Sequence, residues 1–326
     1  MRQKLRSPAY EDAFVDVLGA RVHYLHAGTG RPMLLIHGLA GSCFNWRRNI
    51  DALSQEASIY AIDLVNMGRS RRVAGLDAGL EATADRIALI MTALGLEEAD
   101  IAGHSHGGAV ALMFAARHPK RVRSLILFAP ANPYSNASDF LVRFYSTFPG
   151  RLAARIGPYV PRSIQLIALG RMYGDPERIV DGTLEGYVDG LRVPGTVRHV
   201  LSAVRGWFSD MAKLKGVLPR LTATPTLLVW GDRDRAVDLD SASRLRRILR
   251  RSELCVVEGG GHVVFEEMPE QSNRIMLEWM RSDLAAQGDT DGEGSSSAWG
   301  RELPRTASAV GRPRTAAAME RLPSAS

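Results

Sequence analysis

Residues 99–108 read ADIAGHSHGG, and this stretch decides the fold that the sequence predicts. Asp100-Ile101-Ala102 is typical of a buried strand, and residues 106–117 form a helical pattern that ends before Pro119. Between them, residues 103–107 match the pattern G-x-S-x-G. A strand that turns sharply into a helix at this pattern raises the serine hydroxyl above a sheet. The stretch therefore indicates Ser105 as a nucleophile at a helix N-terminus, where the helix dipole favours negative charge.

Short apolar runs bounded by turns repeat on both sides of this stretch. They predict strands at 22–25, 32–36, 59–62, 122–128, 226–230 and 254–257. Helical patterns lie between them, at about 77–94, 240–250 and 269–286. Continuous apolar runs fit strands that are buried on both faces. The alternation therefore predicts an α/β protein with a mostly parallel central sheet flanked by helices.

This alternation breaks between residues 131 and 222. The segment shows no clear strand, but it has helical fragments, for example at 151–157 and 162–172. A helical cap inserted between two late strands would lie over the carboxyl edge of the sheet, where such folds bind ligands. The predicted organisation is an N-terminal lead-in (1–13), a core (14–130 and 223–286), a helical cap (131–222) and a C-terminal tail (287–326). The tail is rich in Gly, Ser, Ala and Pro, which predicts disorder.

A serine nucleophile needs a base and an acid that orients it. His262 follows the strand predicted at 254–257, in a glycine-rich loop that could carry its imidazole over the sheet edge. Three carboxylates follow the strand at 226–230, namely Asp232, Asp234 and Asp238. Asp232 fits a turn-capping residue and Asp238 a helix-entry residue, so Asp234 is the preferred partner of His262.

Two backbone N–H groups are expected to stabilise an oxyanion. One is that of His106, which directly follows the nucleophile, and the other is that of Leu39, in the loop after the strand at 32–36. His37 precedes this loop and could be mistaken for a second base. Because His262 already fills that position, His37 is interpreted as a structural residue that packs the loop.

Together these segments resemble the α/β-hydrolase superfamily, in its branch of serine esterases and lipases. The resemblance covers about residues 20–285, and it rests on the elbow at 103–107 and on the segments 37–39, 63–70, 230–234, 261–262 and 269–270. In that family, the segment D-x-x-x-x-G-x-S (63–70 here) is a structural and pocket-wall element. Haloalkane dehalogenases and epoxide hydrolases of this fold use an Asp nucleophile. Proline iminopeptidases and carbon–carbon bond hydrolases usually carry other sequences in the loop that reads HGLAG here.

The expected activity is therefore hydrolysis of a carboxylic ester, lactone or thioester through an acyl-enzyme, with Ser105, His262 and Asp234 as the catalytic triad. Neither a metal nor another cofactor is expected. Apolar side chains of the cap predict a small hydrophobic substrate, with Phe140, Phe144 and Trp207 as candidate binding residues. Two alternatives stay open: a lyase or cofactor-free oxygenase on the same fold, and a ligand-binding or sensing homologue.

Composition argues against several other classes. The formal charge is +6, but the chain has few lysines, and its arginines are spread out and not interleaved with aromatics, so no nucleic-acid partner is expected. The two cysteines, Cys43 and Cys255, form no metal-binding or disulfide pattern. No apolar stretch is long enough to span a bilayer, and the start of the chain has no signal-like apolar region. These features predict a cytoplasmic protein without a membrane span, and they carry no signal for an oligomeric state.

Overall fold

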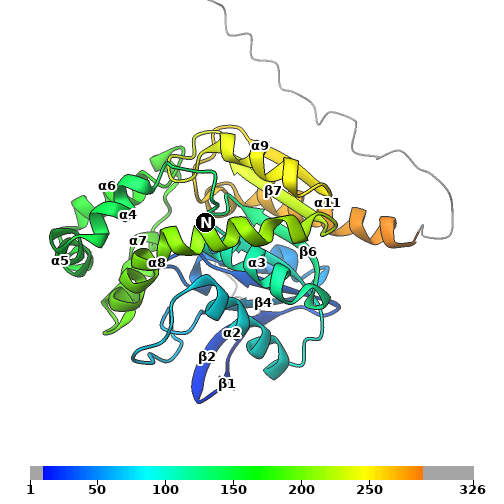
Figure 1. Ribbon diagram of the computed structural model, residues 1–326, viewed down its shortest axis with the longest axis horizontal. Helices are drawn as coiled ribbons and strands as arrows, with labels where there is room; N and C mark the ends of the chain where they lie inside the picture. The colour runs from blue at the N-terminus through cyan, green and yellow to red at the C-terminus, as the bar shows by residue number, and fades with distance from the viewer. Residues whose placement is uncertain (1–9, 289–326) are drawn as a thin grey trace, which may run out of the picture. The chain divides into compact units, whose positions relative to one another are not determined.

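An eight-stranded sheet forms the centre of the computed structural model, which describes residues 10–288 and the side chains of residues 10–282 (Figure 1). Its strand order is β1-β2-β4-β3-β5-β6-β7-β8. Only the pairs β1–β2 and β2–β4 are antiparallel, and every later pair of neighbours is parallel. The mostly parallel sheet predicted from the apolar runs is therefore confirmed.

The elements have the following bounds. The strands are β1 (Glu11–Val17), β2 (Ala20–Ala27), β3 (Arg31–Ile36), β4 (Ala57–Ile62), β5 (Ala99–His104), β6 (Val122–Phe128), β7 (Thr226–Gly231) and β8 (Ser252–Val257). The α-helices are α1 (Ile50–Leu53), α2 (Leu80–Ala93), α3 (His106–Arg117), α4 (Asp139–Ser146), α5 (Phe148–Ile156), α6 (Arg162–Gly170), α7 (Thr183–Arg192), α8 (Thr196–Val217), α9 (Leu239–Ile248), α10 (Val264–Glu267) and α11 (Pro269–Gly288). The 3₁₀-helices are η1 (Cys43–Trp46), η2 (Pro119–Arg121), η3 (Gly157–Tyr159), η4 (Pro176–Arg178) and η5 (Leu218–Leu221).

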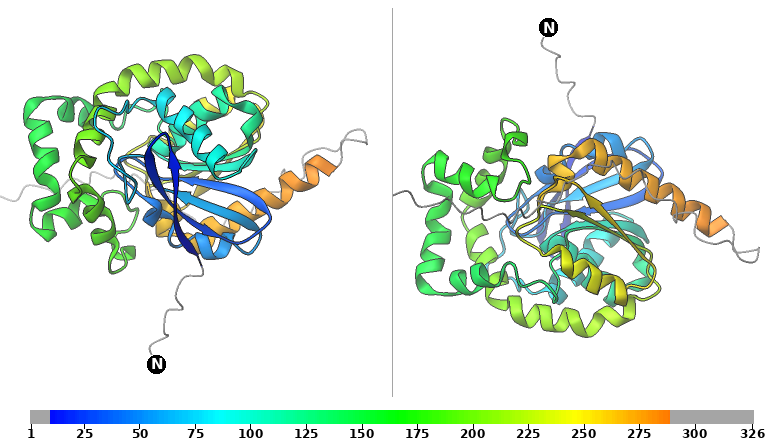
Figure 2. Two further views of the ribbon diagram at one scale, coloured as in Figure 1. Left: turned by 90° about the horizontal axis from the view of Figure 1, so that it is seen from below. Right: turned by 90° about the horizontal axis from the view of Figure 1, so that it is seen from above.

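The two faces of the sheet bury alternate residues of each strand. In β3, Leu34 and Ile36 pack with α2, α3 and α9, whereas Met33 and Leu35 pack with α1 and α11 on the opposite face. Figure 2 shows the orange α11 on one side of the sheet, and the yellow α9 with the yellow-green α8 on the other. Because side chains alternate along a strand, a fully covered sheet needs continuous apolar runs, as this sequence has.

The structure differs from the sequence prediction at the N-terminal end. β1 begins at Glu11, so residues 11–13 belong to a strand and not to the lead-in predicted over 1–13, of which residues 1–9 lie outside the described residues. β1 is an edge strand that pairs only with β2, and much of it is exposed. An edge strand of this kind carries no continuous apolar run, which is why the pattern did not reveal it.

The segment between β6 and β7 contains five α-helices, α4 to α8, and no strand, as the broken alternation predicted. Three of these helices, α4, α5 and α6, lie together beyond the end of the sheet, whereas α8 runs back along it (Figure 1). At the other end of the chain, α11 extends to Gly288, and the tail predicted from residue 287 otherwise lies outside the described residues. Among the described helices, none is both long and apolar enough to cross a membrane.

An aromatic cluster lies in the core directly beneath the carboxyl edge of the sheet. The ring of Phe265 lies 4.3 Å from that of Trp46, 5.4 Å from that of Phe128 and 4.9 Å from that of His104, measured between centroids. Trp46, Phe128 and Phe265 are fully buried. Each ring therefore stabilises the fold both by burying apolar surface and by its contacts with the other rings. Together the rings support the loops that leave this edge.

Removing one of these rings should weaken folding strongly. We expect Phe128→Ala to lower the free energy of unfolding by about 3–5 kcal/mol, because it leaves a cavity in a close-packed core. The matched control is Phe140→Ala, since Phe140 is 77% exposed and should change stability by no more than about 0.5 kcal/mol. Urea unfolding followed by tryptophan fluorescence measures both. Equal losses for the two variants would contradict this account of the core.

Candidate active site

Ser105 lies in a strained turn between β5 and α3. Its backbone has φ 51° and ψ −119°, a left-handed conformation that a residue with a side chain rarely adopts. The turn is held by its own hydrogen bonds. The N–H of Ser105 donates to the carbonyl of Phe128 at 3.0 Å, and the carbonyl of Ser105 accepts from the N–H groups of Gly108 at 2.9 Å and Ala131 at 2.9 Å. Strain of this kind persists only where the surrounding structure enforces it, and it is common at functional sites.

The glycines of the motif are required by close backbone contacts. A Cβ atom on Gly103 would lie 2.6 Å from the carbonyl oxygen of Gly107, and one on Gly107 would lie 2.3 Å from that of His37. Both distances are far shorter than a van der Waals contact, and the atoms that would clash belong to the backbone, which cannot shift as a flexible side chain could. The G-x-S-x-G pattern thus follows from how tightly β5, α3 and the loop after β3 approach one another.

His262 and Asp234 come together from neighbouring loops, after β8 and β7. The Nδ1 of His262 lies 2.8 Å from Oδ2 of Asp234, and both side chains are almost completely buried. Because a carboxylate only accepts, Nδ1–H donates, and Nε2 keeps its lone pair. Among the described residues, no group hydrogen bonds to this Nε2. An imidazole held in this tautomer can accept a proton from a hydroxyl placed beside it.

The other two candidate carboxylates have different contacts. Asp232 accepts from the backbone N–H of Gly259 at 2.7 Å, which ties the loop after β7 to the loop after β8. Asp238 precedes α9 and accepts from the hydroxyl of Ser135 at 3.1 Å and from the N–H of Asn136 at 3.0 Å. Asp234 is thus the one of the three that contacts His262, as the sequence analysis preferred.

A cavity of about 250 Å³ contains Ser105 and His262 in its wall. Its polar wall comes from the loops at the sheet edge, and its apolar wall comes mainly from α4 and α8 through Leu141, Val142, Tyr145, Val204 and Trp207. Trp207, which the sequence analysis predicted as a binding residue, lines this cavity.

Phe140 and Phe144, predicted as binding residues, are both exposed and do not belong to the wall of this cavity. They lie four residues apart and so share one face of α4, whereas Leu141, Val142 and Tyr145 form the face turned to the cavity. The prediction used the residue type, because the sequence did not show which face of α4 meets the core.

The two predicted oxyanion donors lie close to Ser105. Leu39 and Gly38 line the cavity, and His106 is the first residue of α3, where a backbone N–H has no partner inside the helix. Within the described residues, neither the N–H of Leu39 nor that of His106 has a hydrogen-bond acceptor. These groups are therefore available to a ligand.

His37 holds the loop that carries Leu39. Its Nε2 accepts from the N–H of Leu64 at 3.1 Å, so its Nδ1 carries the proton and donates to the carbonyl of Gly38 at 2.8 Å. Burial lowers the pKa of His37 from its usual value. An uncharged imidazole with both nitrogens engaged is a structural residue, in agreement with its interpretation from the sequence.

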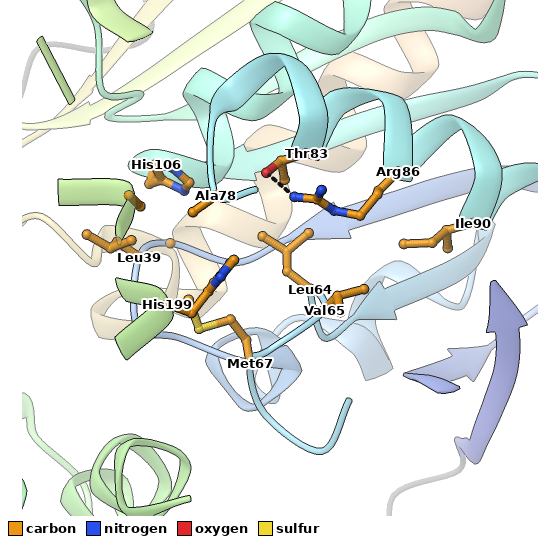
Figure 3. A pocket seen from close by; sticks show the side chains of 12 residues that line it. Leu39, Leu64, Val65, Met67, Ala78, Thr83, Arg86, Ile90, His106 and His199 are labelled. Atoms are coloured by element: carbon orange, nitrogen blue, oxygen red, sulfur yellow. Dashed lines mark hydrogen bonds between the residues drawn. The ribbon is translucent and has the colours of Figure 1, made fainter. Parts of the chain in front are cut away.

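A second, smaller cavity of about 20 Å³ lies behind the loop of Leu39 (Figure 3). Its wall includes Leu39, His106, His199 and Arg86, and the guanidinium of Arg86 donates to Thr83 at 2.8 Å. Burial and the neighbouring His37 and His199 lower the pKa of His106 to about 4. Burial and the charges of Arg86 and Arg72 lower that of His199 to about 4. Both imidazoles are therefore neutral at neutral pH, and the space is the size of one water molecule.

Two buried residues that the sequence analysis missed hold the loop of His262. The Nε2–H of His104 donates to the carbonyl of His262 at 3.0 Å. The carboxylate of Glu267 accepts from the N–H groups of Gly261 at 2.7 Å and Gly174 at 3.0 Å, and so joins this loop to the segment between β6 and β7. The available signal was the pair of acidic residues in the otherwise apolar run 263–268, since buried carboxylates are rare without partners.

One cluster in the described part of the chain has the residue types of a metal site. The nearest side-chain donor atoms of His23, Cys43 and Asp63 all lie within 4.8 Å of one another. Asp63 already accepts from Nδ1 of His23 at 2.7 Å and from the N–H groups of Cys43 and Arg69, each at 2.6 Å. Burial, together with Asp63, raises the pKa of the Cys43 thiol far above its usual value. Because the carboxylate of Asp63 already has three donors and Nδ1 of His23 is bonded to it, we interpret the cluster as structural.

The Asp63 cluster yields a stability prediction with a defined pH dependence. Burial alone would raise the pKa of Asp63, but the hydrogen bond from His23 and the backbone donors of Arg69 and Cys43 lower it below its usual value. Its ionised form therefore stabilises the fold above the unfolded-state pKa of about 3.9, and this contribution is lost as the pH falls through the lower folded-state pKa.

We expect Asp63→Asn to lower the free energy of unfolding by about 2–4 kcal/mol at pH 7, and the difference from wild type to shrink as the pH falls from 5 towards 3. Urea unfolding at several pH values measures this. Asp181→Asn is the matched control, because Asp181 is exposed. A deficit that stayed constant over this pH range would show that the charge of Asp63 does not stabilise the fold.

Comparisons with known proteins agree with this architecture. Residues 31–163 match the family model described as the alpha/beta hydrolase fold. The dihydrolipoyllysine-residue acetyltransferase component of the acetoin cleaving system of Pseudomonas putida is 30% identical over 280 residues, which are 85% of this chain and 70% of that protein. A 2-hydroxy-6-oxo-2,4-heptadienoate hydrolase of Pseudomonas putida is 27% identical over 82% of this chain and 94% of its own length. Among solved structures, a bacterial membrane phospholipase A superposes with a TM-score of 0.70 at 26% identity, over 85% of this chain and 87% of that one.

Proposed function

This chain belongs to the α/β-hydrolase family, and from that premise we propose that it is a serine hydrolase that cleaves a carboxylic ester bond through an acyl-enzyme. The proposed triad is Ser105 as nucleophile, His262 as base and Asp234 as the acid that orients the base. The backbone N–H groups of Leu39 and His106 are the proposed oxyanion hole. Lactones and thioesters react by the same chemistry and belong to the same substrate class.

One observation carries this proposal. Ser105, in a strained turn, shares a cavity with the imidazole of His262, whose Nδ1 is bonded to the buried Asp234 at 2.8 Å. An ordinary glycine-rich turn would need neither the strain nor a buried histidine–carboxylate pair beside it. A nucleophile, a base and an orienting acid on one cavity form the constellation that activates a serine hydroxyl.

The proposed reaction has two steps. Nε2 of His262 takes the proton of Ser105 as Oγ attacks the ester carbonyl, and the negative charge on the carbonyl oxygen is stabilised by the two N–H groups. The imidazolium then protonates the leaving alcohol, and the acyl group stays on Ser105. A water molecule that gives its proton to His262 attacks the acyl carbonyl, and the bond to Oγ of Ser105 breaks as the imidazolium returns the proton to Oγ, which releases the acid and restores both residues.

The substrate should be apolar near the scissile bond. The segment between β6 and β7 supplies the apolar wall of the cavity, so we propose that it is a cap that selects the substrate. The similarity to a structure described as a membrane phospholipase A supports the same substrate class. Because the cap residues contact the acyl or alcohol group rather than the reacting atoms, they should affect selectivity more than chemistry.

Cleavage of a carbon–carbon bond is the second candidate, because one relative is named a hydrolase of a heptadienoate. Such a substrate carries a carboxylate, which would need a cationic partner in a buried site. Of the residues that line the cavity, none is Lys or Arg. This favours a neutral ester.

A lyase, a cofactor-free oxygenase or a ligand-binding homologue could use the same fold, and the intact proposed triad argues against the ligand-binding homologue.

The identity of the nucleophile can be tested by labelling. We expect a fluorophosphonate probe to label the wild type, and Ser105→Ala to abolish labelling and lower the turnover of p-nitrophenyl esters by about four to six orders of magnitude. Ser138→Ala is the matched control, because Ser138 lines the same cavity and should leave labelling intact. Substantial esterase activity in folded Ser105→Ala would contradict the assignment.

Substrate preference separates the two candidate reactions. With p-nitrophenyl esters of increasing acyl length, we expect kcat/KM to rise roughly two- to fourfold per added methylene until the cavity is full, since each buried methylene contributes about 0.8 kcal/mol. The same enzyme is then assayed with a 2-hydroxy-6-oxo-dienoate. Faster turnover of the dienoate than of every ester, or no dependence on acyl length, would favour carbon–carbon cleavage over the proposed ester hydrolysis.

A further inference from the structure

Helices α4, α5 and α6 expose apolar side chains that a soluble domain usually buries. Phe148 is 70% exposed and Ile167 is 69% exposed. We call this surface the α4–α6 face and define it by seven exposed side chains: Phe140, Phe144, Phe148, Leu152, Ile156, Ile164 and Ile167. The three helices lie together beyond the end of the sheet (Figures 1 and 2). An exposed apolar surface of this extent usually marks a binding site.

The spacing of these residues shows that they form stripes. In α5, Phe148, Leu152 and Ile156 recur every four residues and therefore share one side of the helix. Phe140 and Phe144 in α4 are also four residues apart, and Ile164 and Ile167 in α6 are three apart, so each pair shares one side of its helix. A helix on the surface of a globular protein normally turns its apolar stripe to the core. Here the stripes face solvent, and the one residue that α5 buries is Gly150.

The charge of the same segment is mostly positive, and Asp139, the first residue of α4, is its one acidic residue. Residues 140–171 contain five arginines, at positions 143, 151, 155, 162 and 171, and no aspartate or glutamate. Arg162 pairs with Glu185 of α7 at 2.9 Å. Arg155 and Arg171 are exposed, and neither forms an ion pair with any described residue. The face thus combines protruding apolar side chains with two arginines, Arg155 and Arg171, that have no ion-pair partner within residues 10–282.

We propose that the α4–α6 face docks on a membrane surface that contains anionic lipids, with the protein bound peripherally. Amphipathic helices with aromatic and aliphatic residues on one side and arginines nearby lie at the boundary between headgroups and acyl chains. There the apolar side chains leave water and the arginines meet lipid phosphates. A second copy of this chain fits less well, because a two-fold interface would bring the arginines of both copies together.

Docking by this face would bring the catalytic cavity close to the lipid. Helix α4 contributes Phe140 and Phe144 to the face, and it contributes Leu141, Val142 and Tyr145 to the wall of the cavity. Leu141 is itself exposed as well as cavity-lining. The docking inference does not depend on the proposed ester chemistry, since it rests on the outer surface of α4, α5 and α6.

Vesicle flotation tests the proposal with the full chain carrying Ser105→Ala, so that no lipid is consumed and the result is independent of catalysis. Vesicles of phosphatidylcholine alone are compared with vesicles that contain about 30% phosphatidylglycerol. We expect binding to the anionic vesicles that weakens as salt rises. The double change Phe148→Ser with Ile167→Ser should weaken this binding at least about tenfold. Arg155→Gln with Arg171→Gln should weaken it severalfold, on anionic vesicles only.

Matched controls are available elsewhere on the surface. Leu18→Ser removes an 85%-exposed apolar residue in the turn between β1 and β2, and Arg247→Gln removes an exposed arginine of α9. Both should bind vesicles like the parent, and thermal melting should show that all variants stay folded. The proposal is overturned if the parent does not bind anionic vesicles, or if the face variants bind as well as the controls. It is also overturned if sedimentation shows a dimer that the Phe148 and Ile167 changes convert to a monomer.

Discussion

The strained turn at Ser105 is the constraint on which the rest of the site depends. β5 must pass directly into α3 without a loop, so the backbone of one residue adopts a left-handed conformation that its side chain disfavours. Hydrogen bonds to Phe128 and from Ala131 hold it there, and both partners lie at the end of the neighbouring β6. These hydrogen bonds to the neighbouring strand offset the conformational strain of the turn. The aromatic cluster beneath this edge is part of the same support, because it fixes the ends of the strands.

The loop of His262 is held from several directions, which matters for the proposed base because it must keep one position. His104, next to Ser105, binds the carbonyl of His262, and the carbonyl of Met172 accepts from the N–H of His262 at 2.8 Å. Glu267 binds the N–H of Gly261. The Met172 contact ties the loop directly to the segment between β6 and β7, and Glu267 ties it indirectly, because its carboxylate also accepts from the N–H of Gly174. That segment therefore has a structural part in the site, in addition to the selectivity that we propose for it.

The helices between β6 and β7 present apolar side chains in two different places. One side of α4 completes an apolar cavity, whereas its other side, together with α5 and α6, leaves apolar side chains in water. Keeping such a surface exposed has a cost in solubility and offers no gain in folding stability. The lipid docking that we infer would explain why these apolar side chains stay exposed. The absence of acidic residues over 140–171 is hard to explain by packing alone.

The sequence by itself predicted the α/β class, the strands β2 to β8, the helices α2, α3, α9 and α11, and Ser105, His262 and Asp234 as the candidate triad. Local rules were sufficient for these, because buried parallel strands need continuous apolar runs and a strand-to-helix elbow needs small residues around its serine. Only the tertiary structure decided which side of α4 faces the cavity, and hence that Leu141 and Tyr145 line it while Phe140 and Phe144 do not. It also decided that His104 and Glu267 hold the loop of His262, and that β1 forms the edge of the sheet. The physical reason is that these features depend on contacts between segments far apart in the chain, and a local pattern of residue types does not encode which segments will meet.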